Sequence, residues 1–281
     1  MVDSMRMILC GVRGSTPAPG PEFVRYGGHT SCVALCHDGE PPSLILDAGT
    51  GIRRVTKLLE GEPFRGTILL GHLHWDHTQG LPFFSAGDRP DAVVELYMPA
   101  QGEPESVLAG MMSSPYFPIT PSELRGKWAF RSLEPGEHRI EGFTVHALDI
   151  PHKGGRSFGY RITDGPSSIA YLSDHAPLNL GPGDDALGEY HSTAMTLARG
   201  CSVLIHDAQY TDAELPERAG WGHSSSGYAV GFARAAGADR VLLFHHDPSR
   251  TDDAIDDIAA RYCVSSLVVT AASEELVIDL P

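Results

Sequence analysis

The feature that most constrains this fold is an apolar strand that runs into a turn rich in histidine. Residues 67–71 (TILLG) precede His72, His74, Asp76 and His77. Alternate side chains of an extended chain share a face, so His72 and His74 are expected to point the same way. The turn that follows can bring Asp76 and His77 to an adjacent position. The four side chains thus offer two sets of nitrogen and oxygen ligands, which suit zinc first and manganese or iron as alternatives.

Four side chains cannot complete two metal sites, so the other ligands must come from elsewhere. His152 follows the segment FTVHALDIP, Asp174 closes SSIAYLSD, and His245 follows VLLF. Sites are often built where strands give way to loops. Each residue alone could be a cap or a surface group, but their ordered recurrence favours a shared site. His246 is an alternative to His245, and we favour His245 because strand alternation lets only one of them face the site.

Short β-branched and aliphatic runs alternate with Gly/Pro turns and helical stretches, without an internal repeat. Strands are predicted near 6–11, 31–36, 43–47, 66–71, 92–97, 143–149, 158–163, 168–173, 201–206, 240–244 and 275–279. Helices are predicted near 50–60, 104–112, 224–236 and 251–260. The pattern indicates two sheets with helices outside, in one domain spanning residues 1–281. Residues 98–128 are predicted to form a loop with one short helix that lines or covers a site.

The net charge and the lengths of the apolar segments limit the classes of partner that the chain can bind. The formal net charge is −15, and a partner bound through many phosphates needs basic side chains to release its counterions. We therefore expect a small anion held by metals, and not long nucleic acid. The N-terminus lacks the apolar stretch of a signal peptide, and no segment approaches the roughly 20 apolar residues that cross a bilayer. These features predict a cytoplasmic protein with no membrane partner.

The ordered segments HLHWDH, PHKGG, YLSDH and FHHDP resemble the ligand motifs of the metallo-β-lactamase superfamily. LIHDAQY and GWGHSSSGYAV further resemble the acidic and histidine motifs of the phosphodiesterase branch that includes tRNase Z. The resemblance covers nearly the whole chain. It implies an α+β fold, a four-layer αββα sandwich, with two divalent metal ions.

The resemblance also implies a role for each motif residue. It assigns His72, His74 and His152 to the first metal, Asp76, His77 and His245 to the second, and Asp174 to both. Asp76 is also expected to orient a hydroxide that bridges the metals, and His223, held by Asp207, to protonate the leaving group. Without the resemblance, His223 is equally well explained as a residue at the start of a helix capped by Ser224, Ser225 or Ser226.

Two features around the motifs are interpreted as supporting parts of the site. Asp47 is expected to orient a metal-bound histidine from behind. Gly49 and Gly51, in the segment LDAGTG, either present amides to an anion or let the chain pass tightly under the metals, and we favour the second explanation. The role of His29, which stands where relatives usually carry asparagine, stays open.

Departures from the family pattern shape the expected function. The stretch 98–128 is too short for the tRNA-gripping arm of tRNase Z, and its basic residues are Arg125 and Lys127. We therefore expect a phosphodiesterase of a small substrate such as a cyclic nucleotide, with a homodimer as the assembly often found in relatives. The alternatives are an RNA-processing nuclease of the tRNase Z type and a thioester, lactone or β-lactam hydrolase. A binding protein that kept the hydrolase fold but lost its activity would lack some of the metal-ligand residues, and none of these residues is missing from the sequence.

Overall fold

The structure is a computed structural model that describes residues 4–177, 191–262 and 267–281. Within these ranges the chain forms two seven-stranded sheets. In spatial order, the first sheet contains β14 (Val277–Leu280), β1 (Met5–Gly11), β2 (Cys32–His37), β3 (Leu44–Leu46), β4 (Arg65–Leu69), β5 (Val93–Pro99) and β6 (Lys127–Leu133). The second contains β13 (Val268–Ala271), β12 (Arg240–Phe244), β11 (Val203–Asp207), β10 (Ser167–Leu172), β9 (Phe158–Asp164), β8 (Phe143–Asp149) and β7 (Gly136–Ile140).

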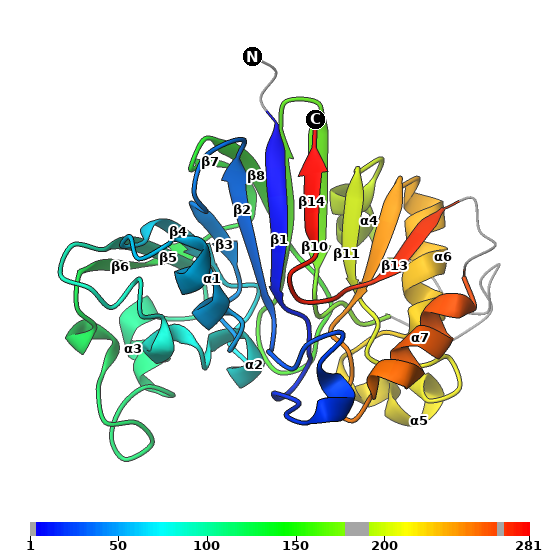
Figure 1. Ribbon diagram of the computed structural model, residues 1–281, viewed down its shortest axis with the longest axis horizontal. Helices are drawn as coiled ribbons and strands as arrows, with labels where there is room; N and C mark the ends of the chain where they lie inside the picture. The colour runs from blue at the N-terminus through cyan, green and yellow to red at the C-terminus, as the bar shows by residue number, and fades with distance from the viewer. Residues whose placement is uncertain (1–3, 178–190, 263–266) are drawn as a thin grey trace.

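The helices lie on the outer faces of the two sheets (Figure 1). The α-helices are α1 (Ile52–Leu58), α2 (Trp75–Thr78), α3 (Pro104–Ala109), α4 (Ser192–Ala198), α5 (Leu215–Arg218), α6 (Ser226–Ala236) and α7 (Asp252–Ala260). Single 3₁₀ turns are η1 (Pro21–Phe23), η2 (Leu81–Phe83), η3 (Pro121–Glu123) and η4 (Ala219–Trp221). None of the helices in the described ranges is long and apolar enough to span a membrane.

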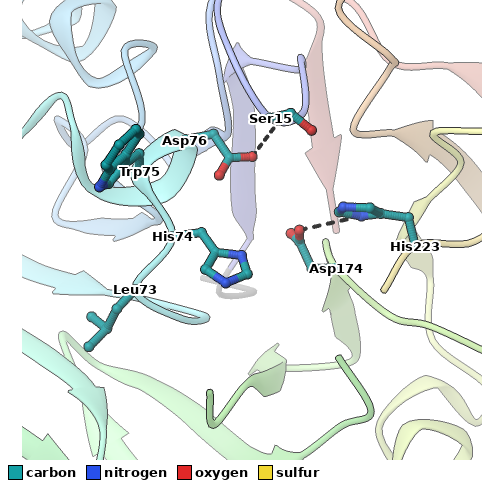
Figure 2. Close-up of a pocket in the computed structure, with 7 residues that line it drawn as sticks. All are labelled: Ser15, Leu73, His74, Trp75, Asp76, Asp174 and His223. Carbon is teal, nitrogen blue, oxygen red and sulfur yellow. Dashed lines mark hydrogen bonds and ion pairs between the residues drawn. The ribbon is translucent and has the colours of Figure 1, made fainter. Parts of the chain in front are cut away.

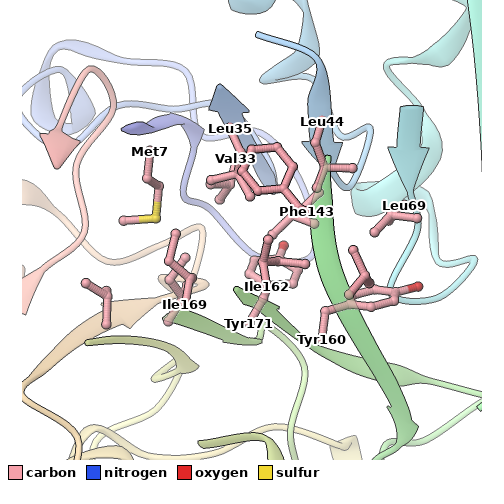
Figure 3. Close-up of a cluster of buried hydrophobic side chains, with 14 of the residues drawn as sticks. Met7, Val33, Leu35, Leu44, Leu69, Phe143, Tyr160, Ile162, Ile169 and Tyr171 are labelled. Carbon is pink, nitrogen blue, oxygen red and sulfur yellow. The ribbon is translucent and has the colours of Figure 1, made fainter. Parts of the chain in front are cut away.

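The layers follow from the alternation of apolar side chains along the strands. On β3, Leu44 and Leu46 belong to the core between the sheets, whereas Ile45 packs with Ile52 and Val55 of α1 on the outer face. Figure 3 shows the inner core, in which side chains of both sheets interdigitate. On the far side, α4 and α6 cover β10, β11 and β12. These layers are the predicted αββα sandwich.

The helix caps explain where two helices begin. The hydroxyl of Ser225 accepts a hydrogen bond from the backbone N–H of Tyr228 at the start of α6. Thr251 caps α7 through the N–H of Ala254. Ser225 is thus the cap among the three serines that the sequence offered.

The predicted strands and helices are all present, with bounds that shift by a few residues. The prediction lacked β6, β7 and β13, and it also lacked α4 and the one-turn helices α2 and α5. In the stretch 98–128 the expected short helix is α3, and the ends of the stretch belong to β5 and β6.

The parallel parts of the two sheets bring several strand ends together. β3, β4, β5 and β6 run parallel in the first sheet, as do β10, β11, β12 and β13 in the second. The carboxyl ends of β4, β10, β11 and β12 lead directly into the histidine- and aspartate-bearing segments. Ligand sites of layered proteins commonly form at such ends.

Candidate metal centre

The histidine-rich turn contains a one-turn helix. β4 ends at Leu69, and His74 precedes α2 in an extended conformation with φ −65° and ψ 156°. Asp76 and His77 lie in the only turn of α2, and both are buried. The reversal at His74 lets residues on either side of it face one space.

The first group of candidate ligands consists of three histidines. One ring nitrogen from each of His72, His74 and His152 lies within 4.8 Å of the other two. Nδ1 of His152 donates to the carbonyl oxygen of Gly222 at 2.7 Å, so its Nε2 carries the lone pair that faces Nδ1 of His74 at 3.2 Å. Burial lowers the pKa of His72 and of His152. The neutral imidazole that results is the form that binds a cation.

The second group combines carboxylates and imidazoles. Ligand atoms of Asp76, His77, Asp174 and His245 lie within 4.8 Å of one another. Nε2 of His77 is 3.0 Å from Asp174, and Nε2 of His245 is 3.0 Å from Asp76. Burial alone would lower the pKa of both histidines, but the carboxylates outweigh it, so the pKa of His77 lies well above its usual value and that of His245 rises to about 9. A divalent cation would displace the protons that these carboxylates attract.

Asp174 lies between the two groups. Its Oδ1 is 3.9 Å from Nε2 of His72, 4.0 Å from Nε2 of His152 and 3.2 Å from Nε2 of His245, and its Oδ2 is 3.0 Å from Nε2 of His77. Within the described part of the chain, both of its buried oxygens lack a hydrogen-bond partner, as do the Nε2 atoms of His72 and His77. A buried carboxylate whose oxygens accept no hydrogen bond is costly. These orphaned donor atoms therefore fit a site for divalent cations.

Asp47 stands behind His77, where the sequence predicts a residue that orients a ligand. Its Oδ2 accepts hydrogen bonds from Nδ1 of His77 and from the hydroxyl of Tyr171, both at 2.7 Å. Its Oδ1 accepts one from the N–H of Gly71, also at 2.7 Å. The carboxylate fixes the tautomer of His77 and leaves Nε2 for the centre. Nothing in the sequence pointed to Tyr171.

A second chain of hydrogen bonds orients His245 and Asp76. Nδ1 of His245 donates to the side-chain oxygen of Gln209 at 2.9 Å, and the amide of Gln209 donates to the hydroxyl of Ser15 at 3.3 Å. The N–H of Ser15 donates to Asp76 at 2.6 Å. Sequence analysis missed Gln209 and Ser15, because an amide and a hydroxyl far apart in the chain carry no spacing signal.

His245, and not His246, points into the centre. Nε2 of His246 donates to the carbonyl oxygen of Ala272 at 2.8 Å, away from the other candidate ligands. The reason differs from the predicted one, because His245 lies beyond the end of β12 with a left-handed φ of 60°. Turn geometry, and not strand alternation, separates the two side chains.

His29 lies apart from the centre. Its ring contacts the hydroxyl of Thr50 at 3.2 Å, and its N–H donates to Glu274 at 2.6 Å. These contacts hold the loop at the start of α1.

Asp207 and His223 lie side by side at the rim of the centre. Nδ1 of His223 donates to Oδ2 of Asp207 at 2.8 Å. Oδ1 of Asp207 accepts from the N–H groups of Gln209 and Ser224 at 3.1 and 2.9 Å. Asp207 also lies near Asp174 and His245, in an arrangement that could hold a cation. Because its oxygens already accept these three hydrogen bonds, it is better suited to orient His223 than to bind a metal.

A pocket of about 350 Å³ opens onto these groups, and we call it the metal pocket. Figure 2 shows His74, Asp76, Asp174 and His223 around a common space, with Ser15 beside Asp76. A Cβ on Gly49 would lie 2.2 Å from the backbone oxygen of Asp76. This close approach supports tight passage of the chain as the reason for that glycine.

Comparison with known proteins gives matches over this whole region. The family model of the Beta-lactamase superfamily domain matches residues 43–246. A ribonuclease Z of Exiguobacterium sibiricum is 27% identical over 259 residues, which cover 77% of this chain and 82% of the relative. The metallo-beta-lactamase fold protein YhfI from Bacillus subtilis has a TM-score of 0.72 at 18% identity, over 99% of this chain and 100% of that chain. A diphosphatase from the PhnP family has a TM-score of 0.66 at 18% identity, over 98% and 97%.

Proposed function

This chain belongs to the metallo-β-lactamase superfamily, near its tRNase Z branch, and is a metal-dependent hydrolase; from that premise we propose that it hydrolyses a small phosphodiester such as a cyclic nucleotide. The observation that carries the proposal is the pair of Asp207 and His223, which adds a proton donor to the rim of the metal pocket.

The proposed metal ligands are the two groups described above. His72, His74 and His152 would hold the first cation, Asp76, His77 and His245 the second, and Asp174 both. The unpartnered buried atoms of His72, His77 and Asp174 support this assignment. Nitrogen and carboxylate oxygen donors favour Zn²⁺, with Mn²⁺ or Fe²⁺ as alternatives. Two such cations supply a water of lowered pKa and offset negative charge on a bound phosphate.

The residues around the cations would orient the attacking water and protonate the leaving group. Asp76, held by the N–H of Ser15, orients the attacking water. The Nδ1 of His223 is committed to Asp207, so its Nε2 is the nitrogen available to a substrate in the metal pocket. A proton held there passes to the leaving alkoxide oxygen as the P–O bond breaks.

The charge of the protein supports a small substrate. The chain carries a net charge of −15, and the side chain of Arg125, one of two basic residues in the stretch 98–128, pairs with Asp88 at 2.8 Å. RNA binding needs unpaired basic side chains along the phosphate backbone. An RNA-processing nuclease is the second candidate, and the similarity to a ribonuclease Z favours it.

A substrate panel separates these functions. The zinc-loaded protein is assayed on bis(p-nitrophenyl) phosphate, several 3′,5′-cyclic nucleotides, precursor tRNA and a lactone. We expect turnover of the small phosphodiesters. Cleavage of precursor tRNA without turnover of cyclic nucleotides would favour the nuclease, and activity on the lactone alone would contradict phosphodiester chemistry altogether.

The leaving group tests the role of His223. In His223→Ala, turnover of substrates with an alkoxide leaving group should fall about 10²- to 10⁴-fold, whereas p-nitrophenyl esters should lose far less because p-nitrophenolate leaves without a proton. His138→Ala is the matched control, since this half-buried histidine of β7 does not line the metal pocket and bonds the carbonyl of Glu134. Equal losses on both substrate types would remove His223 from the proton-donor role.

A further inference from the structure

A second, larger cavity adjoins the metal pocket. It has a volume of about 620 Å³, and Trp75 lines both this cavity and the metal pocket, so the two lie next to each other. Trp75 stands between His74 and Asp76 in sequence, and 74% of its surface is exposed. A large apolar side chain in that position does not contribute to the core. It forms a wall that both cavities use.

Aromatic and methionine side chains make the other walls of this cavity, which we call the aromatic groove. Phe83 and Phe117 meet edge to face with ring centroids 5.8 Å apart. Tyr116 is 80% exposed, and Met111 lines the same cavity. The stretch 110–117, which follows α3, thus lines the groove from one side, while η2 supplies Phe83 from the other.

The groove has the chemistry of a site for a flat, uncharged ring. None of the nine residues that line it is charged. Its hydrogen-bonding side chains are Trp75, Gln79 and Tyr116, and the amide of Gln79 is oriented by a 3.3 Å hydrogen bond to Thr30. Exposed aromatic faces bind nucleobases by stacking, and a few polar groups then select the base edge. A phosphate or a charged peptide would find no partner there.

We propose that the aromatic groove binds the nucleobase of a nucleoside phosphodiester whose phosphate lies in the metal pocket. The inference rests on the proposed function and specifies its substrate class. The decisive observation is that Trp75 lines both cavities, so a ligand with its phosphate in the metal pocket has the aromatic groove beside it. The volume of the groove also falls within the range of about 300–1,000 Å³ that small-molecule sites occupy.

The experiment measures binding and does not depend on turnover. Adenosine 5′-monophosphate and ribose 5-phosphate are titrated into the zinc-loaded protein by calorimetry. The base-bearing ligand should bind about tenfold more tightly, since stacking of a base on an aromatic side chain typically contributes that much. Tyr116→Ala and Phe117→Ala should remove most of this difference and leave the affinity for ribose 5-phosphate unchanged.

Control variants keep the result interpretable. Tyr116 is so exposed that its loss should not disturb folding, even if Phe117→Ala does. Val268→Ala on β13 removes another exposed apolar side chain outside the groove and should change neither affinity. Equal affinity of the two ligands in the unaltered protein would overturn the inference.

Two other outcomes separate the groove from its alternatives. If no phosphodiester is hydrolysed but the base still binds through Tyr116, the proposed function fails and the groove assignment stands. In the second outcome, bis(p-nitrophenyl) phosphate is hydrolysed but Tyr116→Ala leaves nucleotide affinity unchanged and converts a dimer to a monomer in sedimentation. The groove is then occupied by a second copy of the chain, and the nucleobase assignment is wrong.

Discussion

The metal centre and the aromatic groove adjoin each other but are built differently. Candidate ligands of the centre come from four separate strand ends, and several are fixed by hydrogen bonds to groups behind them, such as Asp47 and Gln209. Most of the groove comes from the single stretch 110–117 and from exposed rings. The centre is thus anchored in both sheets, whereas the groove can change without altering the sandwich. In this arrangement the proposed reaction would depend on the scaffold, and the proposed choice of substrate would depend on a local segment.

Removing the carboxylate between the two ligand groups should have the largest effect. In Asp174→Ala, metal content measured by mass spectrometry should fall below two ions per chain, and turnover should fall by more than the roughly 10–100-fold that a change behind a ligand causes. Asp239→Ala, an exposed carboxylate between α6 and β12, should keep both ions. Full retention of two ions by Asp174→Ala would refute its place as a shared ligand.

Removing a residue that orients a ligand should reduce metal binding less than removing a ligand itself. Asp47→Ala leaves the Nδ1 of His77, the hydroxyl of Tyr171 and the N–H of Gly71 without their acceptor. We expect zinc affinity to fall about 10–100-fold, measured by competition with a chelator, and the free energy of unfolding to fall by about 2–4 kcal/mol. Unchanged zinc affinity would mean that His77 does not depend on Asp47.

An ion pair outside the metal centre and the aromatic groove shows how much a polar contact contributes to stability where no metal is involved. Nδ1 of His37 lies 2.8 Å from Asp164, and its Nε2 lies 2.9 Å from the carbonyl of Glu141. Partial burial opposes these contacts, but they raise the pKa of His37 above its usual value.

The sign of the pH effect follows from that shift. A raised pKa in the folded state contributes stability that is fully present below the pKa of the unfolded chain, about 6.5, and lost as the pH rises through the folded value. His37→Gln should therefore destabilise the protein by at most about 1 kcal/mol at pH 5.5 and by less at pH 9. Thermal unfolding at both pH values measures this, and a larger loss at pH 9 would contradict it.

The smallest effect on stability is expected in the groove itself. Tyr116→Ala removes a side chain that is 80% exposed, so the free energy of unfolding should change by no more than about 0.5 kcal/mol. The free energies of unfolding of Tyr116→Ala and Asp47→Ala, measured with denaturant in parallel, test this difference between the groove and the centre. A loss comparable to that of Asp47→Ala would show that the groove is part of the scaffold after all.

The fold could be predicted from the sequence wherever a strand is buried on both sides. β10 is buried along its whole length and was predicted, whereas β6, β7 and β13 were missed and are all edge strands. An edge strand pairs on one side only and can carry charged residues, as in KWAFRSL of β6, so its apolar signal is weak. α2 was missed because it is only one turn long.

The candidate site was predictable to the extent that its groups are histidines or carboxylates at strand ends. All of the predicted metal ligands converge, and so do Asp207 and His223. The groups that orient these ligands could not be predicted from the sequence. The carbonyl of Gly222 that orients His152 belongs to the backbone and has no side-chain signature. Gln209 and Ser15 acquire a role only once the loops after β1 and β11 meet.

We propose that this centre hydrolyses a phosphodiester only when both cations are bound, and a zinc titration of activity tests this. Metal-depleted protein is given increasing equivalents of zinc while hydrolysis of a 3′,5′-cyclic nucleotide is followed. We expect hydrolysis to rise to its maximum as the second equivalent binds. Full activity after one equivalent, or no hydrolysis with both sites filled, would contradict it.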